Sequence, residues 1–248
     1  AMGPWLQYGD SQSHAARLSL EKDLLDELIS GLPEHDLFRQ NFHHSLSNWL
    51  PFYWRGFRQT TRYTYAIEDL SDLEEGWKGF KKRTRNVVGK AQKELQVRSD
   101  LPFERFWELN ALTFQRQNRR LPYSRDFAEA LERACQEAQS RVMLFAEDAM
   151  QRVHAAVYVV WDANSAYYLM GGADPALRMS GATSLLLWEA IQYSAKVTKR
   201  FDFEGSMIKP IESFFSGFGA RQIPYFNITR MNLRTKLLFS LRDLVKSD

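Results

Sequence analysis

Residues 141–204 constrain the fold more than any other stretch, because helix and strand patterns follow one another there over a short distance. The stretch begins with three strand candidates, at 141–147, 154–161 and 166–172, which are rich in β-branched and aromatic residues. Asp162-Ala163-Asn164-Ser165, between the last two, has the composition of a hairpin turn. A long apolar helix at about 182–197 and a short strand at 200–204 follow. This order predicts an α/β fold.

Helical patterns fill much of the chain before this stretch. Apolar residues at helical spacing predict an amphipathic helix at 18–32, with Ser19 as the N-cap and Gly31 as the stop. Further helices are predicted at 72–95, 103–117 and 124–138, with an N-cap at Asp72. Between these helices, residues 36–68 are rich in aromatic and β-branched side chains and predict several strands, of which 59–67 is the clearest.

After residue 204 the patterns are shorter. We expect a short helix at 211–216, a strand at 223–231 and a basic amphipathic helix at 233–245.

Composition limits the class of protein. With 248 residues, of which 44% are hydrophobic and 25% charged, the chain is long enough for one large core or two small ones. The single cysteine, Cys135, excludes a disulfide within the chain. No apolar run approaches the roughly 18 residues of a membrane helix, and no signal peptide is recognisable. We therefore expect no membrane span and a cytoplasmic protein.

Positive charges are clustered although the formal net charge is only +3. One cluster lies at 78–93, and a second contains Arg116, Arg119, Arg120 and Arg125. Basic surfaces of this kind suit a phosphate-bearing partner, and they are equally typical of a solvated helix face.

Three strings of residues, taken in order and spacing, resemble one known family. The first is Tyr63-Thr64-Tyr65-Ala66-Ile67-Glu68-Asp69-Leu70 followed by Lys81-Lys82-Arg83-Thr84-Arg85, and the second is Thr113-Phe114-Gln115-Arg116-Gln117. The third is Phe201-Asp202-Phe203-Glu204-Gly205-Ser206, which leads to Phe215-Ser216-Gly217-Phe218-Gly219-Ala220. Together they resemble the GNAT-like acyltransferases that are grouped with the Fem-type peptidoglycan aminoacyltransferases.

The resemblance implies both a fold and a reaction. The fold would be a mixed, twisted sheet with flanking helices, whose central strands splay to admit a phosphopantetheine arm or an aminoacyl group. The reaction would be N-acyl transfer, in which an amine on a peptide, a cell-wall precursor or an amino sugar attacks a thioester or an aminoacyl ester. The donor would be acetyl-CoA or another acyl-CoA as co-substrate, or an aminoacyl-tRNA, and no cofactor would be bound permanently.

The loop at 178–184 is the predicted donor site. A glycine-bearing turn before a helix exposes backbone N–H groups that can bind a pyrophosphate, although such a turn is more often a simple helix cap. The resemblance identifies this loop as the pyrophosphate-binding turn, with the usual glycine pair reduced to Gly181-Ala182. The residues expected to bind the donor are Arg178, Ser180, Gly181, Ala182, Thr183 and Ser184.

A second departure from the related pattern concerns a lysine. Relatives often carry a lysine suited to a donor phosphate before the Phe-Gly step, where this chain has Ser216. If tRNA binds, other cations must contact its phosphates, and Lys209, Arg221 and the cluster at 81–85 are the available ones.

Three residues are the candidates for catalysis. Asp202 and Glu204 alternate with Phe201 and Phe203, so on a strand both carboxylates would point to one face, where either can serve as a general base. Structural ion pairs with Arg85 or Arg62 are the alternative. Tyr225, like Tyr168, is placed to protonate a leaving thiolate or hydroxyl, although tyrosines on strands usually pack.

The acceptor is expected to meet polar side chains around this site. The candidates are Arg85, Arg116, His154, Ser206 and Lys209. For His154 a structural role, and for Ser206 a helix cap, are the alternatives. We expect no metal site, because His43 and His44 are adjacent and would point to opposite faces of a strand.

The start of the chain bears on domain organisation. The resemblance implies that a segment like Gly3-Pro4-Trp5-Leu6-Gln7-Tyr8 normally follows an opening helix and several strands. We therefore interpret residues 1–70 as the remnant of a first GNAT-like lobe and residues 71–248 as a GNAT-like acyltransferase domain with a C-terminal helix. An unpaired sheet edge in the first part would favour a homodimer.

One hypothesis of a different class stays open. A degenerate, non-catalytic GNAT-like module would use its basic faces to bind RNA or an acidic partner. The two hypotheses differ in whether Asp202 and Glu204 face an open cleft beside the Gly181 turn.

Overall fold

The computed structural model describes residues 3–7, 13–205 and 207–235. The chain forms two compact units, of which the first contains residues 1–63 and 223–248 and the second residues 64–222. The interpretation of residues 1–70 as the remnant of a lobe, and the expected homodimer, stay predictions.

A mixed sheet is the centre of the second unit, in the strand order β2-β7-β6-β5-β4-β3. Strands β3, β4, β5 and β6 are antiparallel neighbours, β6 and β7 are parallel, and β7 is antiparallel to β2. The bounds are β2 Arg58–Ile67, β3 Leu95–Arg98, β4 Arg141–Asp148, β5 Val153–Trp161, β6 Ala166–Ala173 and β7 Phe201–Asp202. The predicted α/β fold with a mixed sheet is confirmed.

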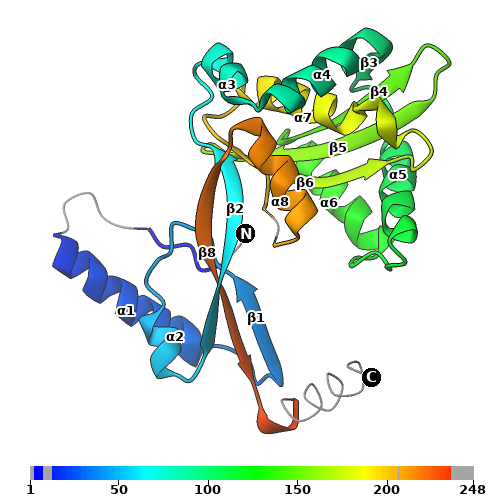
Figure 1. Cartoon of the computed structure of the whole chain (residues 1–248). Coiled ribbons are helices and arrows are strands. Elements are labelled where there is room, and N and C mark those ends of the chain that lie inside the picture. The colour runs from blue at the N-terminus through cyan, green and yellow to red at the C-terminus, as the bar shows by residue number, and fades with distance from the viewer. Residues whose placement is uncertain (1–2, 8–12, 206, 236–248) are drawn as a thin grey trace. The chain divides into compact units, whose positions relative to one another are not determined.

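Helices cover both faces of this sheet (Figure 1). On one face α4 (Lys82–Glu94) and α7 (Ala182–Ser194) pack over a core that contains Val157, Leu186 and Phe203. On the other face α5 (Phe103–Arg116) and α6 (Arg125–Glu137) enclose Phe106 and Tyr158. Alternate residues of β5 therefore enter different cores. The remaining elements of this unit are α3 (Leu73–Gly79), η1 (Arg178–Ser180), α8 (Lys209–Phe215) and η2 (Ser216–Phe218).

The first unit has its own core. Helix α1 (His14–Ser30) and the short helix α2 (Leu50–Trp54) enclose Leu25, Phe42 and Phe52. Strand β1 (Leu37–Asn41) pairs antiparallel with β8 (Arg221–Met231), and Ile228 of β8 is fully buried in the same core. No described helix of either unit is long and apolar enough to cross a membrane.

Most predicted elements are present, and the differences have local causes. The N-cap of α1 is Ser13 instead of Ser19, because the Ser13 side chain accepts a hydrogen bond from the backbone N–H of Ala16. The helix predicted at 72–95 is interrupted between α3 and α4, where the buried Phe80 has an extended backbone and packs against Trp188 and Phe218. Helix α2 lies inside a region predicted as strands and has proline in its first turn.

Two further predictions differ in extent. Strand β7 has only two residues, and the predicted strand 200–204 was too long. Of the helix predicted at 233–245, residues 236–245 lie outside the described residues, and Asn232 caps its start by accepting a hydrogen bond from the backbone N–H of Thr235.

Helix α5 approaches strand β6 so closely that only glycine fits between them. A Cβ on Gly172 would lie 2.3 Å from the carbonyl carbon of Leu109 and 2.4 Å from the backbone nitrogen of Asn110. The side chain of Asn110 also donates a hydrogen bond of 2.8 Å to the carbonyl oxygen of Gly171. Backbone contacts therefore fix α5 on the sheet.

Gly172→Ala should destabilise the protein, because the new methyl group would overlap the backbone of α5. We expect a loss of about 1–3 kcal/mol in the free energy of unfolding, measured by urea denaturation. Gly89→Ala in α4 is the matched control, since a Cβ there would meet no atom within 4 Å. A helix-interior Gly→Ala change of this kind should stabilise by roughly 0.5–1 kcal/mol. Equal stabilities of the two variants would contradict the close packing of α5 on β6.

Candidate functional site

Strands β6 and β7 diverge in the middle of the second unit. They pair only at Ala166 with Phe201 and at Tyr167 with Asp202. Beyond that point β6 continues to Ala173, whereas the backbone N–H of Phe203 donates to the carbonyl oxygen of Tyr65 in β2, at 2.8 Å. The chain after β7 therefore stays with β2 and leaves β6. The predicted splaying of two central strands is present at this position.

A bulge in β6 determines which side chains line the divergence. The β5–β6 register shifts between Tyr158 and Val159, so Leu169 has no partner and Tyr168 and Gly171 pair with Val159 and Val157. Tyr168 and Gly171 consequently share the face covered by α7, and a Cβ on Gly171 would lie 2.0 Å from the hydroxyl oxygen of Tyr168. The Tyr168 ring therefore lies over the backbone of Gly171.

Aromatic side chains line this side of the divergence. The ring of Phe215 lies 6.1 Å from the ring of Tyr168 and 5.1 Å from that of Phe203, centre to centre. Burial, with a smaller contribution from Tyr123, raises the pKa of Tyr168 to about 12. Its hydroxyl therefore keeps its proton at neutral pH and is available as a donor.

The predicted donor loop forms a tight turn at the start of α7. Gly181 has φ of +76°, and a Cβ on it would lie 2.7 Å from Cγ1 of Val87 in α4. Glycine is required there for both reasons. The Ser180 hydroxyl accepts a hydrogen bond of 3.4 Å from the backbone N–H of Ala182, while Arg178 is exposed and Ser184 is buried. The arrangement presents the amino end of a 13-residue helix beside α4.

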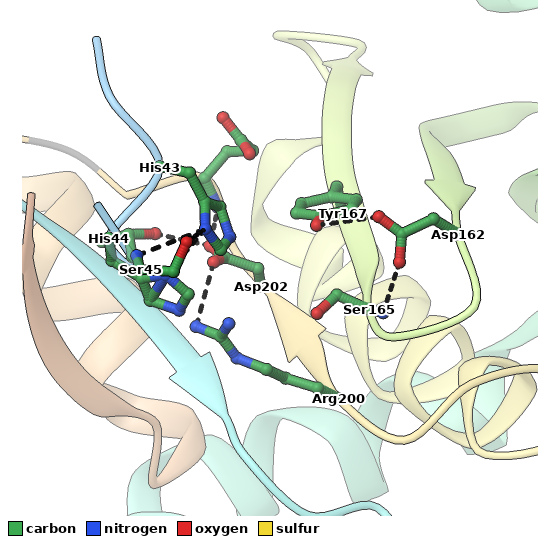
Figure 2. A network of polar contacts seen from close by, with 10 residues as sticks. His43, His44, Ser45, Asp162, Ser165, Tyr167, Arg200 and Asp202 are labelled. Carbon is green, nitrogen blue, oxygen red and sulfur yellow. Dashed lines mark hydrogen bonds and ion pairs between the residues drawn. The ribbon is translucent and has the colours of Figure 1, made fainter. Parts of the chain in front are cut away.

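Asp202 is the most heavily bonded carboxylate near the divergence, and Figure 2 shows it beside Arg200. Its side chain is 4% exposed and accepts hydrogen bonds from Oγ1 of Thr64 at 2.5 Å and Nη2 of Arg200 at 3.3 Å. It also accepts from the backbone N–H of Glu204 at 2.8 Å. Its ion-pair partner is Arg200 and not Arg85 or Arg62. Asp202 does not face an open cleft, and its bonds suit a positioning role.

Glu204 lies in an unusual backbone conformation directly after β7. Its φ is +58°, and that of Gly205 is +62°. Because β7 ends at Asp202, the expected alternation that would place both carboxylates on one face of a strand is wrong. A non-glycine residue in this region is strained, and strain of this kind is typical of functional sites. Asp202 holds the turn through the Glu204 N–H, and Glu204 itself is half-buried.

Lys81, from another part of the chain, lies at Ser216, the position where relatives were expected to carry a lysine. Nζ of Lys81 donates a hydrogen bond of 3.1 Å to Oγ of Ser216. The backbone N–H of Lys81 also donates to the carbonyl oxygen of Gly217 at 2.9 Å. The chain therefore brings an ammonium group to the residue where relatives were expected to carry their own.

The other predicted site residues are spread over the second unit. Arg85 donates hydrogen bonds to the carbonyl oxygens of Lys78 and Phe80, at 2.5 and 2.7 Å, and so terminates α3. Nε2 of His154 lies 3.1 Å from Oδ2 of Asp148, whose pKa is lowered chiefly by the side chain of Arg152. Arg116 and Lys209 are exposed, at the end of α5 and the start of α8.

Two predicted residues are not part of the described site. Tyr225 lies in β8 within the first unit, and Ser206 lies outside the described residues. The fold also brings Thr64, Arg200 and Lys81 to the site. No role was predicted for Thr64 or Arg200. Asp162 and Tyr167 also interact near β6, and Figure 2 shows the hydroxyl of Tyr167 directed at Asp162, at 3.2 Å.

His43 and His44 are not on a strand, so the reason given against a metal there was wrong. They lie in a turn of the first unit with their Nδ1 atoms 3.2 Å apart, and Nδ1 of His43 is 2.7 Å from Oγ of Ser45 (Figure 2). Among the described residues, no group of three or more His, Cys, Asp or Glu side chains is arranged to hold a metal ion.

A hollow of about 320 Å³ in the second unit lies at the end of β2 and beside α3. Acidic side chains line it, but their local bonds account for them. Asp69 and Asp72 accept hydrogen bonds from the backbone N–H groups of Ser71 and Glu75. Glu68 pairs with Arg221 at 2.7 Å.

Comparison with known proteins gives one family match. Residues 78–206 match the family described as acetyltransferase (GNAT) domain. No curated protein matches the chain.

Solved structures resemble the fold at low sequence identity. FemX is 12% identical with a TM-score of 0.66, and the alignment covers 86% of this chain and 76% of FemX. The C-terminal domain of a putative lysylphosphatidylglycerol synthetase from Agrobacterium fabrum is 12% identical with a TM-score of 0.60, covering 92% of this chain and 78% of that one. L-PGS from Bacillus licheniformis is 13% identical with a TM-score of 0.50, covering 92% and 78%. These likenesses show the fold.

Asp202→Asn should destabilise the protein much more than Glu204→Gln. The first change leaves the guanidinium of Arg200, 13% exposed, without its charged partner, which should cost roughly 2–4 kcal/mol in the free energy of unfolding. Glu204 is half-buried, so its change should cost less. Urea denaturation of both variants at neutral pH measures the difference. A larger loss for Glu204→Gln would contradict the positioning role of Asp202.

Proposed function

Because this chain belongs to the GNAT acetyltransferase family, we propose that it is an N-acyltransferase that uses a CoA thioester as donor and an amine as acceptor. The observation that carries the proposal is the divergence of β6 from β7 directly before the Gly181 turn at the start of α7. A donor with a pyrophosphate and a narrow arm fits this combination, since the helix start provides backbone N–H groups and the divergence leaves the edge of β6 beyond Tyr167 unpaired by β7.

The proposed reaction is attack of an amine on a thioester. The nitrogen forms a bond to the carbonyl carbon, the carbon–sulfur bond breaks, and the amine loses one proton. Glu204 accepts that proton, because it is the carboxylate that the strained turn presents. Tyr168 supplies a proton to the leaving thiolate, since its raised pKa keeps the phenol protonated.

Binding both substrates in this arrangement contributes at least as much to the rate acceleration as proton transfer does. Fixing the amine against the carbonyl removes much of the entropic cost of bringing two molecules together. Asp202 contributes indirectly by holding the Glu204 turn through its backbone N–H. Amines of peptides, cell-wall precursors and amino sugars remain the proposed acceptors.

An aminoacyl-tRNA is the second candidate donor. The position of the Lys81 ammonium at Ser216 favours it, because this pair provides a cation where relatives were expected to use a lysine against a donor phosphate. The same acyl-transfer chemistry would follow from an ester donor, with a ribose hydroxyl as the leaving group.

Acetyl-CoA should stabilise the chain against thermal unfolding. A ligand present at ~100 times its dissociation constant and bound only to the folded state adds roughly 2.7 kcal/mol. Gly181→Ala should reduce this increase, because the new Cβ would force the turn away from Val87. Gly89→Ala is the control and should keep the increase. If neither acetyl-CoA nor longer acyl-CoA thioesters stabilise the chain, aminoacyl-tRNA becomes the proposed donor.

Glu204→Gln should lower kcat for amine acylation by about 10²- to 10⁴-fold, the usual contribution of a general base. The KM for the donor should change little, because Glu204 is assigned to the acceptor amine. The measurement is thiol release from acetyl-CoA over a panel of amines, with Glu212→Gln in α8 as the control carboxylate. Glu212 accepts a hydrogen bond from the Tyr65 hydroxyl and has no proposed catalytic role. A normal kcat for Glu204→Gln would show that Glu204 is not the general base. If the unsubstituted protein transfers no acyl group from either donor, the non-catalytic hypothesis is favoured.

A further inference from the structure

The outer face of helix α4 carries positive charge that the donor site does not explain. Val88 and Ala91 of α4 are buried in the core, and Val87 contacts the Gly181 turn, so these residues define the inner face. Lys82, Gly89 and Lys93 are seven and four residues apart, and this spacing places them together on the opposite face. Figure 1 shows α4 on the helical layer at one side of the sheet.

Lysines dominate this outer surface. The basic side chains of Lys82, Arg83, Lys90 and Lys93 are all exposed. Glu94 is the only acid of α4, and its ion pair with Lys90, at 4.0 Å, is long and well exposed. The first turn of α4 has no acidic residue and no side-chain cap, although cations are unfavourable beside the positive end of a helix dipole. An external anion would offset this repulsion.

Gly89 has no structural reason to be glycine. A Cβ would meet no atom within 4 Å, and glycine inside a helix costs about 0.5–1 kcal/mol relative to alanine. Its φ is not positive, since it is not among the residues with left-handed backbone. Because glycine has no side chain, nothing projects from the centre of the basic face between Lys82 and Lys93. A broad anionic surface can then approach all of the lysines together.

We propose that the outer face of α4 binds the surface of an anionic lipid bilayer and so brings the protein to a membrane without inserting a helix. Each lysine near such a surface strengthens binding roughly fivefold, so several are needed together. The binding is reversible and weakens as salt screens the charges. This proposal is independent of the donor and of the acyl-transfer reaction.

Nucleic acid fits the same face less well. The face is mostly lysine, and the guanidinium of Arg85 is already bonded to the carbonyl oxygens of Lys78 and Phe80. Helix α4 has no aromatic residue on which a base could stack.

Co-sedimentation of the full chain with lipid vesicles tests the proposal. One set of vesicles is phosphatidylcholine alone, and the other is phosphatidylcholine mixed with phosphatidylglycerol. We expect binding to the second set at low salt, little binding to the first, and release at high salt. Lys82→Ala with Lys93→Ala should weaken binding to the anionic vesicles roughly 25-fold, as the product of two lysines.

The control variant removes the same charge elsewhere in the second unit. Lys196→Ala with Lys199→Ala changes two exposed lysines beyond the end of α7 and should leave vesicle binding nearly unchanged. Gly89→Glu introduces a carboxylate at the centre of the face, where there is room for it, and should weaken binding roughly fivefold, like the loss of one lysine. Circular dichroism melting of each variant checks that it is folded.

Three outcomes would overturn the proposal. The first is equal binding to neutral and anionic vesicles, and the second is an equal loss in the α4 variant and the control variant. The third is tight binding of duplex RNA at physiological salt together with no binding to anionic vesicles, which would assign the face to nucleic acid.

Discussion

The buried carboxylate of Asp202 is the constraint on which the rest of the candidate site depends. A carboxylate that is 4% exposed is unfavourable unless it is fully bonded, and here Thr64, Arg200 and the backbone N–H of Glu204 satisfy it. These partners come from β2, from the residue before β7 and from the turn after β7. One side chain therefore joins two strands to a strained turn, at the point where the chain leaves β6 after two paired residues.

Strand β6 meets two different requirements through its bulge and its glycine pair. Gly172 allows the backbone of α5 to lie against one face of the sheet, whereas Gly171 leaves space on the other face for the hydroxyl of Tyr168. Without the bulge at Leu169, Tyr168 would face the same side as Gly172 and would meet α5. The register shift thus separates a packing contact from the proposed proton donor, Tyr168, within four residues of the same strand.

The sequence predicts helices and strands with a clear periodic pattern well, and contacts between residues far apart in the chain poorly. Residues 103–117, 124–138 and the hairpin around Asp162 form as predicted, because their patterns and caps act locally. The interruption at Phe80, the two-residue length of β7 and the bulge at Leu169 depend on tertiary packing that no local pattern records. The resemblance singled out Asp202 and Glu204, but the different surroundings of the two carboxylates depend on Thr64 and Arg200. Thr64 lies 138 residues before Asp202, and no spacing rule connects them.

The pair formed by Lys81 and Ser216 bears on the proposed donor site, where the chain departs from the related pattern. Under that proposal, the phosphate-binding cation is needed at a position in space and not at a position in sequence. Gly217 has no side chain, and a Cβ there would lie 2.7 Å from the hydroxyl oxygen of Thr84, so the loop after α8 can approach the start of α4 closely. That approach allows the Lys81 N–H to bond to Gly217 and the Lys81 ammonium to reach Ser216. A small residue at 216 and a lysine at 81 therefore place an ammonium group at the position where we expected relatives to carry one lysine.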